Sequence, residues 1–208
     1  MTLPSSVLNR LPRYYRYLRE LLIDNVLRIS SAELAAHLGL TPSQVRTDLN
    51  YIGSIGQQGY GYSVKQLYTS IGKAMGVADG IKAIVICENN SSIFDRSVFE
   101  SRGVELLAIF TNSSDTTTSH DTHKILDLEE LIPYCNNAAP DLAVILPLKR
   151  DVQKIAESLL SCNIKGIWNF SSTEIRGDGI SIKNTPLSDM LMVLCCEIHN
   201  QSNTEKED

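Results

Sequence analysis

Four short, almost continuously apolar segments in the second part of the chain constrain its fold more than any other feature. They are IKAIVIC (81–87), VELLAIF (104–110), LAVILPL (142–148) and IKGIWNF (164–170). A strand is apolar along its whole length when both faces of its sheet are covered, which is typical of parallel sheets. Parallel neighbours also need long crossover segments, and such segments separate these four runs. The pattern predicts an α/β fold with a parallel sheet between layers of helices.

The segments between these runs predict the helices and a candidate ligand site. Amphipathic stretches at 91–103, 126–135 and 151–163 predict helices, whereas the polar stretch 111–123 predicts a loop. A strand, turn, helix and second strand at the start of such a sheet form a Rossmann-like unit. Such units bind dinucleotides at the turn after the first strand. We therefore predict a Rossmann-like domain over residues 81–185.

Residues 1–80 differ from the rest of the chain in charge. They carry eight basic and five acidic side chains, a net charge of +3, although the whole chain has a net charge of −5. A basic segment on an acidic chain predicts a separate domain with a polyanionic partner.

The apolar spacing in this first domain predicts three helices, at 11–24, 30–39 and 41–53. Ser30 with Glu33, and Thr41 with Gln44, have the spacing of capping boxes, and Gly39 has the position of a helix stop. Two short helices joined by such a turn predict a helix-turn-helix. Similar helix pairs occur in enzymes, so the motif by itself leaves both classes open.

The outer face of the third helix has the polar groups of a DNA reader. Ala35, Leu38 and Val45 are expected to form the apolar seam of the motif. The opposite face then carries Ser43, Arg46, Thr47 and Asn50. Small polar or bidentate side chains on a helix fit the major groove of DNA.

The glycine- and tyrosine-rich stretch GQQGYGYSVKQL (56–67) predicts a tight hairpin, the wing of a winged helix. The stretch Gly59-Tyr60-Gly61-Tyr62 is expected to enter a minor groove, while Lys65 meets a phosphate. An ordinary surface hairpin with exposed tyrosines is the alternative.

The last helix, predicted over 186–200, is apolar nearly all round and precedes a polar tail, 201–208. Such a helix must be buried, so we expect a partner subunit and hence a homodimer. Two winged helices on one dimer predict a palindromic DNA site.

These motifs together resemble the Rex redox-sensing transcriptional repressors of bacteria. The resemblance covers nearly the whole chain and rests on RLPRYYRYL (10–18), SSAELAAHLG (30–39), VRTDLNYIG (45–53), GYGYSV (59–64), IKGIWNF and the terminal helix, in order and at the right spacing. It implies a homodimer with a swapped terminal helix. The dimer would repress fermentation and respiration genes by binding an AT-rich palindromic double-stranded operator, and would release it when NADH occupies the Rossmann-like domain. The sequence has no apolar run long enough to span a bilayer and no apolar signal-peptide core at its start, so we predict a cytoplasmic protein with no membrane partner.

The resemblance implies a DNA-contacting role for Arg10, Arg13, Ser43, Arg46, Thr47, Tyr60, Gly61 and Lys65. The predicted DNA surface also includes polar residues of the helix starts and of the third helix: Ser30, Ser31, Thr41, Gln44 and Asn50.

The turn after the first strand departs from the family pattern. Family members carry G-x-G-x-x-G there, whereas this chain has CENNSSIFD (87–95). Side chains at Asn89, Asn90 and Ser91 would crowd the pyrophosphate, which those glycines let the backbone approach. Glu88 would set a carboxylate near the phosphates, at a cost of about 1–4 kcal/mol.

Two further departures affect the same NADH switch. Thr111 ends the second strand where an acidic residue normally holds the ribose, and Asp115 comes several residues late. Pro186 stands where the family has an aspartate that pairs with a first-helix arginine and couples NADH to DNA release; Asp189 lies one turn away. The candidate cofactor residues are Glu88, Asn89, Asn90, Ser91, Thr111 and Asn169. We predict that NAD(H) sensing is impaired or lost, with no cofactor or an unknown one.

Three alternatives stay open: a repressor that still responds to NADH, a Rossmann-like enzyme, and a modulator that dimerises with a true NADH sensor. The four histidines are dispersed and the five cysteines form no CxxC pair, so the sequence predicts neither an enzyme nor a structural metal site. A thiol switch at Cys87 is a further alternative to a plain buried cysteine.

Overall fold

The computed structural model describes residues 3–53, 60–77, 80–88, 99–100, 102–111, 124–148 and 151–204. The chain divides into two compact units, Met1–Gly80 and Ile81–Asp208. Each unit has its own hydrophobic core, so each is described by itself.

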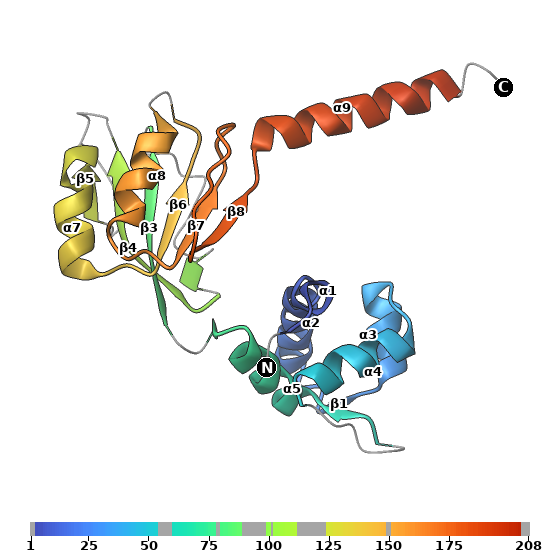
Figure 1. Ribbon diagram of the computed structural model, residues 1–208. Coiled ribbons are helices and arrows are strands. Elements are labelled where there is room, and N and C mark those ends of the chain that lie inside the picture. Colours follow the sequence, from blue (N-terminus) through green and yellow to red (C-terminus); the bar gives the residue numbers. More distant parts are fainter. Residues whose placement is uncertain are drawn as a thin grey trace. The chain divides into compact units, whose positions relative to one another are not determined.

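Unit 1 is mainly helical (Figure 1). Its helices are α1 (Ser5–Leu8), α2 (Leu11–Ile23), α3 (Ser31–Leu38), α4 (Pro42–Tyr51) and α5 (Val64–Ala74). Two short strands, β1 (Arg28–Ile29) and β2 (Tyr62–Ser63), pair in antiparallel fashion. Leu11, Tyr14 and Leu18 of α2 are fully buried together with Leu34 and Leu49 of the helix-turn-helix.

The structure confirms both capping boxes. Ser30 Oγ accepts from the Glu33 amide at 3.1 Å, and the Glu33 carboxylate accepts from the Ser30 amide at 2.7 Å. Thr41 and Gln44 make the corresponding pair at 3.2 and 3.0 Å. Gly39 follows α3 with a φ of +66°, in the left-handed region that favours glycine. The predicted seam is also buried: Ala35, Leu38 and Val45 all lie in the core.

The wing prediction needs correction. Lys65 lies not in a hairpin but in the first turn of α5, a helix that the sequence reading missed. Ser63 caps that helix by accepting a hydrogen bond from the Gln66 amide at 3.4 Å. Tyr62 is buried opposite Ile29, so it cannot enter a DNA groove as predicted. Residues 54–59, which include the first four residues of the predicted hairpin (56–59), lie outside the described residues.

Unit 2 contains a six-stranded parallel sheet. Its strands are β3 (Ile81–Cys87), β4 (Val104–Thr111), β5 (Lys124–Asp127), β6 (Leu142–Ile145), β7 (Gly166–Asn169) and β8 (Ser181–Asn184). Their spatial order is β5-β4-β3-β6-β7-β8. The chain thus starts at the centre, builds to one edge and then returns to build the other, which is the doubly wound Rossmann order.

Side-chain alternation along β3 divides the core of unit 2 between the two faces of the sheet. Ile84 and Ile86 pack with side chains of α7 (Leu131–Ala138) and α8 (Val152–Leu160). Ala83, Val85 and Cys87 belong to a second cluster that includes Phe99. Because both faces are covered, the central strand is apolar along nearly its whole length.

Two elements of unit 2 differ from the prediction. The helix expected over 126–135 begins later, because Lys124–Asp127 pairs with β4 as strand β5 and is followed by a short 3₁₀ turn, Leu128–Glu130. Strand β8 was not predicted, since ISIKN alternates weakly and lies after a glycine-rich segment. The helix expected over 91–103 lies largely outside the described residues.

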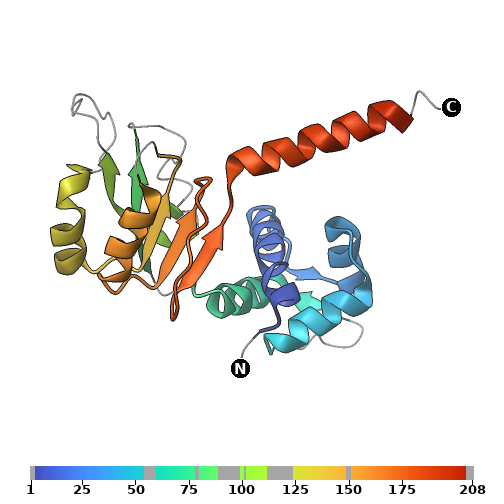
Figure 2. The same ribbon diagram turned by 45° about the horizontal axis from the view of Figure 1, so that its top comes forward.

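The terminal helix α9 spans Leu187–Thr204 and projects from the end of β8 away from the sheet (Figure 2). It therefore includes the first four residues of the predicted tail. Large apolar side chains on it are between 47% and 67% exposed: Leu187, Met190, Leu191, Met192, Val193, Leu194 and Ile198. Among the described helices, none combines the length and apolarity needed to cross a bilayer.

Candidate nucleic-acid interface and ligand edge

Helix α4 has one buried face and one polar, solvent-exposed face. Val45, Asp48 and Leu49 are buried. Ser43, Arg46, Thr47 and Asn50 are exposed, as the sequence predicts. Arg46 also donates to the Ser31 hydroxyl at 3.3 Å, so two predicted contact residues from α4 and α3 lie side by side. The exposed face can offer amide, hydroxyl and guanidinium groups to base edges.

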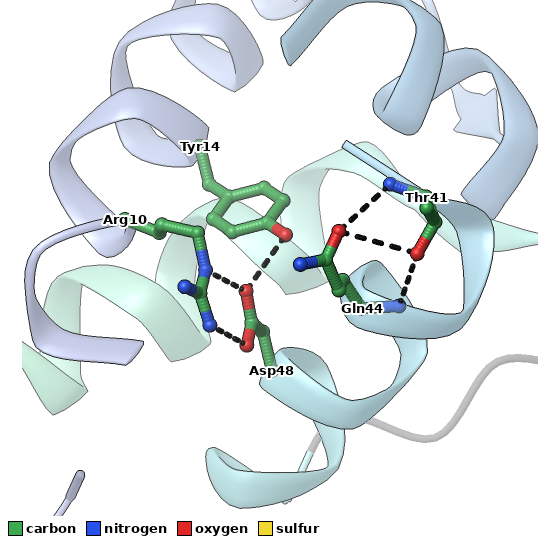
Figure 3. Close-up of polar contacts among 5 residues, drawn as sticks. All are labelled: Arg10, Tyr14, Thr41, Gln44 and Asp48. Carbon is green, nitrogen blue, oxygen red and sulfur yellow. Dashed lines mark hydrogen bonds and ion pairs between the residues drawn. The ribbon is translucent and has the colours of Figure 1, made fainter. Parts of the chain in front are cut away.

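A buried ion pair fixes the orientation of α4 (Figure 3). The Asp48 side chain is only 1% exposed. Arg10, which precedes α2, donates to its two oxygens through Nε and Nη2, both at 2.7 Å. The Tyr14 hydroxyl of α2 donates to the same carboxylate at 3.0 Å. Three donors from one helix end therefore hold the inner face of α4.

The surroundings of Arg10 and Tyr14 favour the protonated form of both donors. The hydrogen bond to Asp48 raises the pKa of Arg10 further above neutrality, although burial opposes it. Burial raises the pKa of the Tyr14 phenol, and the Asp48 charge raises it further. Both donors hold their protons at neutral pH, so the bidentate pair persists there.

Asp48 was missed by the sequence reading, although a signal was present. An aspartate one turn after Val45 and next to Leu49 sits on the apolar face of α4, where an unpaired carboxylate would be costly. Arg10, predicted to contact DNA, instead has two of its three nitrogens bound to Asp48. Its DNA contact stays a prediction, but its structural role comes first.

Other predicted contact residues are also engaged within the fold. Ser30, Thr41 and Gln44 complete the capping boxes that begin α3 and α4. Arg13 donates to the Leu38 carbonyl at the end of α3. These side chains position the helix-turn-helix, whereas Tyr60, 72% exposed, faces solvent.

The carboxyl ends of β3 and β4 form the edge where a Rossmann-like unit binds its ligand, beside the switch point between β3 and β6. Cys87 and Thr111, paired in register at this edge, are both buried. The Thr111 hydroxyl donates to the Glu88 carbonyl at 2.9 Å. A threonine hydroxyl has only one hydrogen to donate, and in Thr111 that hydrogen is directed to the Glu88 carbonyl at the end of the neighbouring strand. Asn89, Asn90 and Ser91 lie outside the described residues.

Asn169, at the end of β7, is fully buried and has its amide engaged on every side. Its nitrogen donates to the Thr173 carbonyl at 2.7 Å and to the Asn184 side chain at 2.8 Å. Its oxygen accepts from the amide and the hydroxyl of Ser171, at 3.0 and 2.7 Å. This predicted cofactor residue therefore closes the loop between β7 and β8, and a ligand would have to break that network.

In the part of the chain that the structure describes, no three His, Cys, Asp or Glu side chains lie close enough together to hold a metal ion. His120 and His123 fall outside the described ranges.

The chain is similar to known DNA-binding proteins and transcriptional repressors. A family model described as "Putative DNA-binding protein N-terminus" matches residues 2–50. The redox-sensing transcriptional repressor Rex of Clostridium botulinum (strain Alaska E43 / Type E3) is 37% identical over 200 residues, covering 94% of this chain and 95% of the relative. Rex of Clostridium kluyveri is 37% identical over 199 residues, with the same coverage.

Solved structures of the repressor RSP are similar along the whole chain. Its complex with β-NAD⁺ and operator DNA has a TM-score of 0.87 and 33% identity, covering 99% of this chain and 97% of that one. Its complex with β-NADH has a TM-score of 0.83 and 31% identity, with full coverage of both chains. The present chain belongs to the Rex family of redox-sensing transcriptional repressors.

Loss of the Arg10 side chain tests the importance of the buried pair. We expect Arg10→Met to lower the free energy of unfolding by about 3–5 kcal/mol, because it leaves the buried Asp48 carboxylate without its cation. Urea unfolding followed by circular dichroism measures the loss. The control is Arg176→Met, which removes an exposed pair with Glu174 at 3.0 Å and should cost less than about 1 kcal/mol. Equal losses would contradict the role of the buried pair.

Proposed function

We propose that this protein is a homodimeric transcriptional repressor that binds a palindromic operator through unit 1 but has an impaired or lost response to NAD(H). The observation that carries the proposal is a contrast between its two candidate sites. The outer face of α4 is exposed, and the helix is held in place on its inner face by the Asp48–Arg10 ion pair. At the ligand edge, the side chains of Thr111 and Asn169 are engaged within the protein.

Operator binding is supported by the exposed groups of α4 and by the relatives. Arg46 can make the bidentate contact with guanine that is the commonest specific contact in the major groove. The RSP structure with operator DNA has the same fold over 99% of this chain. The AT-rich palindrome remains our expectation for the sequence of the site.

Substitution of Arg46 tests DNA binding. Affinity for an AT-rich palindromic duplex should fall as salt rises, because phosphate contacts release counterions. Arg46→Ala should cost about 1–3 kcal/mol, or roughly five- to 150-fold in affinity. Fluorescence anisotropy at several salt concentrations measures both effects. Arg176→Ala, which removes one charge from unit 2, should leave affinity nearly unchanged. Absence of specific, salt-dependent binding by the unaltered protein would contradict the repressor function.

Impaired NAD(H) sensing is supported by the residues around the end of β3. The segment that follows Cys87 has no glycine through Asp95, and Glu88 stands where the glycine-rich turn of the family begins. Thr111 has one hydroxyl where a carboxylate would accept from both ribose hydroxyls, and that hydroxyl donates to the Glu88 carbonyl. These groups do not fit NAD(H). A repressor that retains its NADH response is the second candidate, favoured by the RSP complex with β-NADH.

Titration with NADH separates these candidates. We expect no submicromolar binding by calorimetry or by quenching of Trp168, the single tryptophan, which lies on β7. Glu88→Gly should increase the affinity, by about tenfold for each 1.4 kcal/mol of repulsion that it removes. Glu105→Gly, on β4, is the matched control and should have no such effect. A submicromolar affinity in the unaltered protein would contradict the proposed loss.

Dimerisation is supported by α9. Seven large apolar side chains on this helix are exposed in the single chain. An apolar surface of this kind marks an association site, and a second copy of the chain can cover it by exchanging terminal helices.

Charged substitutions on α9 test the dimer. The double variant Leu191→Glu/Leu194→Glu should sediment as a monomer at micromolar concentration, because two carboxylates would be buried in the interface. Leu27→Glu, which alters an 81% exposed leucine of unit 1, should remain dimeric. A monomeric unaltered protein would contradict this assignment.

A further inference from the structure

The short β1–β2 ladder presents one buried and one exposed face. Ile29 and Tyr62 lie directly opposite each other and are both buried. Because side chains alternate along a strand, the neighbouring pair, Arg28 and Ser63, points to the other face. Arg28 is accordingly exposed.

The chain enters β2 through Gly61, whose backbone lies very close to that of Ile29 in β1. Gly61 has a φ of +67°, and a Cβ built on it would lie 2.5 Å from the Ile29 carbonyl oxygen. Only glycine permits this spacing. The backbone of Gly61 is therefore held against β1, and Tyr60 is the next residue outward.

Arg28 reaches past Gly61 and holds Tyr60 in two ways. Its Nη1 donates to the Tyr60 carbonyl at 3.2 Å. Its guanidinium carbon lies 5.8 Å from the centroid of the Tyr60 ring. The planar guanidinium can make a hydrogen bond and a cation–π contact at once, which a lysine ammonium does less well. The backbone and the ring of Tyr60 are thus restrained by the same side chain.

We infer that Arg28 is a positioning residue for operator binding, acting through Tyr60. This inference rests on the proposed function and on the sequence-based expectation that Tyr60 contacts DNA. Tyr60 is 72% exposed and is the first described residue after the segment 54–59. Restraining it before binding lowers the entropy that association would otherwise cost, so affinity rises without a new contact to DNA.

This role differs from that of a phosphate contact in ways that can be measured. A residue that neutralises one phosphate contributes about 0.9 to the slope of log affinity against log salt. A positioning residue leaves that slope unchanged, and its effect disappears when the group it positions is removed.

The test is a double-mutant cycle in the full-length protein, with operator affinity measured by fluorescence anisotropy at four salt concentrations. Arg28→Gln should weaken binding about fivefold at an unchanged salt slope. Arg28→Lys keeps the charge and should also weaken binding. Tyr60→Ala should weaken binding, and adding Arg28→Gln to it should have no further effect. Arg19→Gln, at an exposed arginine of α2, should show no coupling to Tyr60→Ala. Thermal unfolding of each variant should match the unaltered protein.

Three results would overturn the inference: a salt slope lower by about 0.9 in Arg28→Gln, full affinity in Arg28→Lys, or additive effects of the two substitutions. Each can occur while the unaltered protein still binds its operator, which leaves the proposed function intact. Failure of the unaltered protein to bind specifically would overturn the proposed function together with this inference.

Discussion

The buried carboxylate of Asp48 is the constraint on which the DNA-reading unit depends. A charged group that is 1% exposed must be compensated, and Arg10 and Tyr14 supply three donors to it. All three come from the start of α2, so the ion pair sets how α4 lies against α2. Because the face of α4 that carries Asp48 is held against α2, the opposite face, with Arg46 and Asn50, is exposed to solvent. A replacement of this pair by apolar side chains could preserve stability, but it would remove the directional contact that orients the helix.

Unit 2 follows a different constraint, the satisfaction of polar groups at the carboxyl edge of a parallel sheet. In dinucleotide-binding proteins of this fold, the ligand binds at the carboxyl ends of the strands, next to the polar groups there. In this chain Thr111 bonds to Glu88, and Asn169 links the segments around Ser171, Thr173 and Asn184. These bonds engage the polar side chains of the described part of that edge within the protein. Under the proposed function, the fold that holds NAD(H) in the RSP structures serves here to carry α9 and to join two copies of unit 1 in one dimer.

Prediction from the sequence succeeded where a local pattern has one physical outcome. The apolar runs of β3, β4, β6 and β7 predicted a parallel sheet, and the capping boxes predicted the starts of α3 and α4. It failed where a short segment depends on its neighbours. Lys124–Asp127 forms a strand because the edge of β4 is available beside it, although its sequence leads into a helix. Helix α5 begins at Val64 because Ser63 caps it, within a stretch whose glycines suggested a longer hairpin.

The sequence by itself determined the family, through motifs that occur in order and at the right spacing. It also determined the two-unit organisation and the polar face of α4, because charge, apolar spacing and caps are local patterns. Only the tertiary structure decided what the individual polar groups do. It turned Arg10 inward to Asp48, set Thr111 against Glu88, enclosed Asn169 and brought Arg28 to Tyr60. The partners in these four contacts are separated by 38, 23, 15 and 32 residues. Hydrogen bonds have a short range and a strict geometry, so only the folded chain determines which distant groups meet.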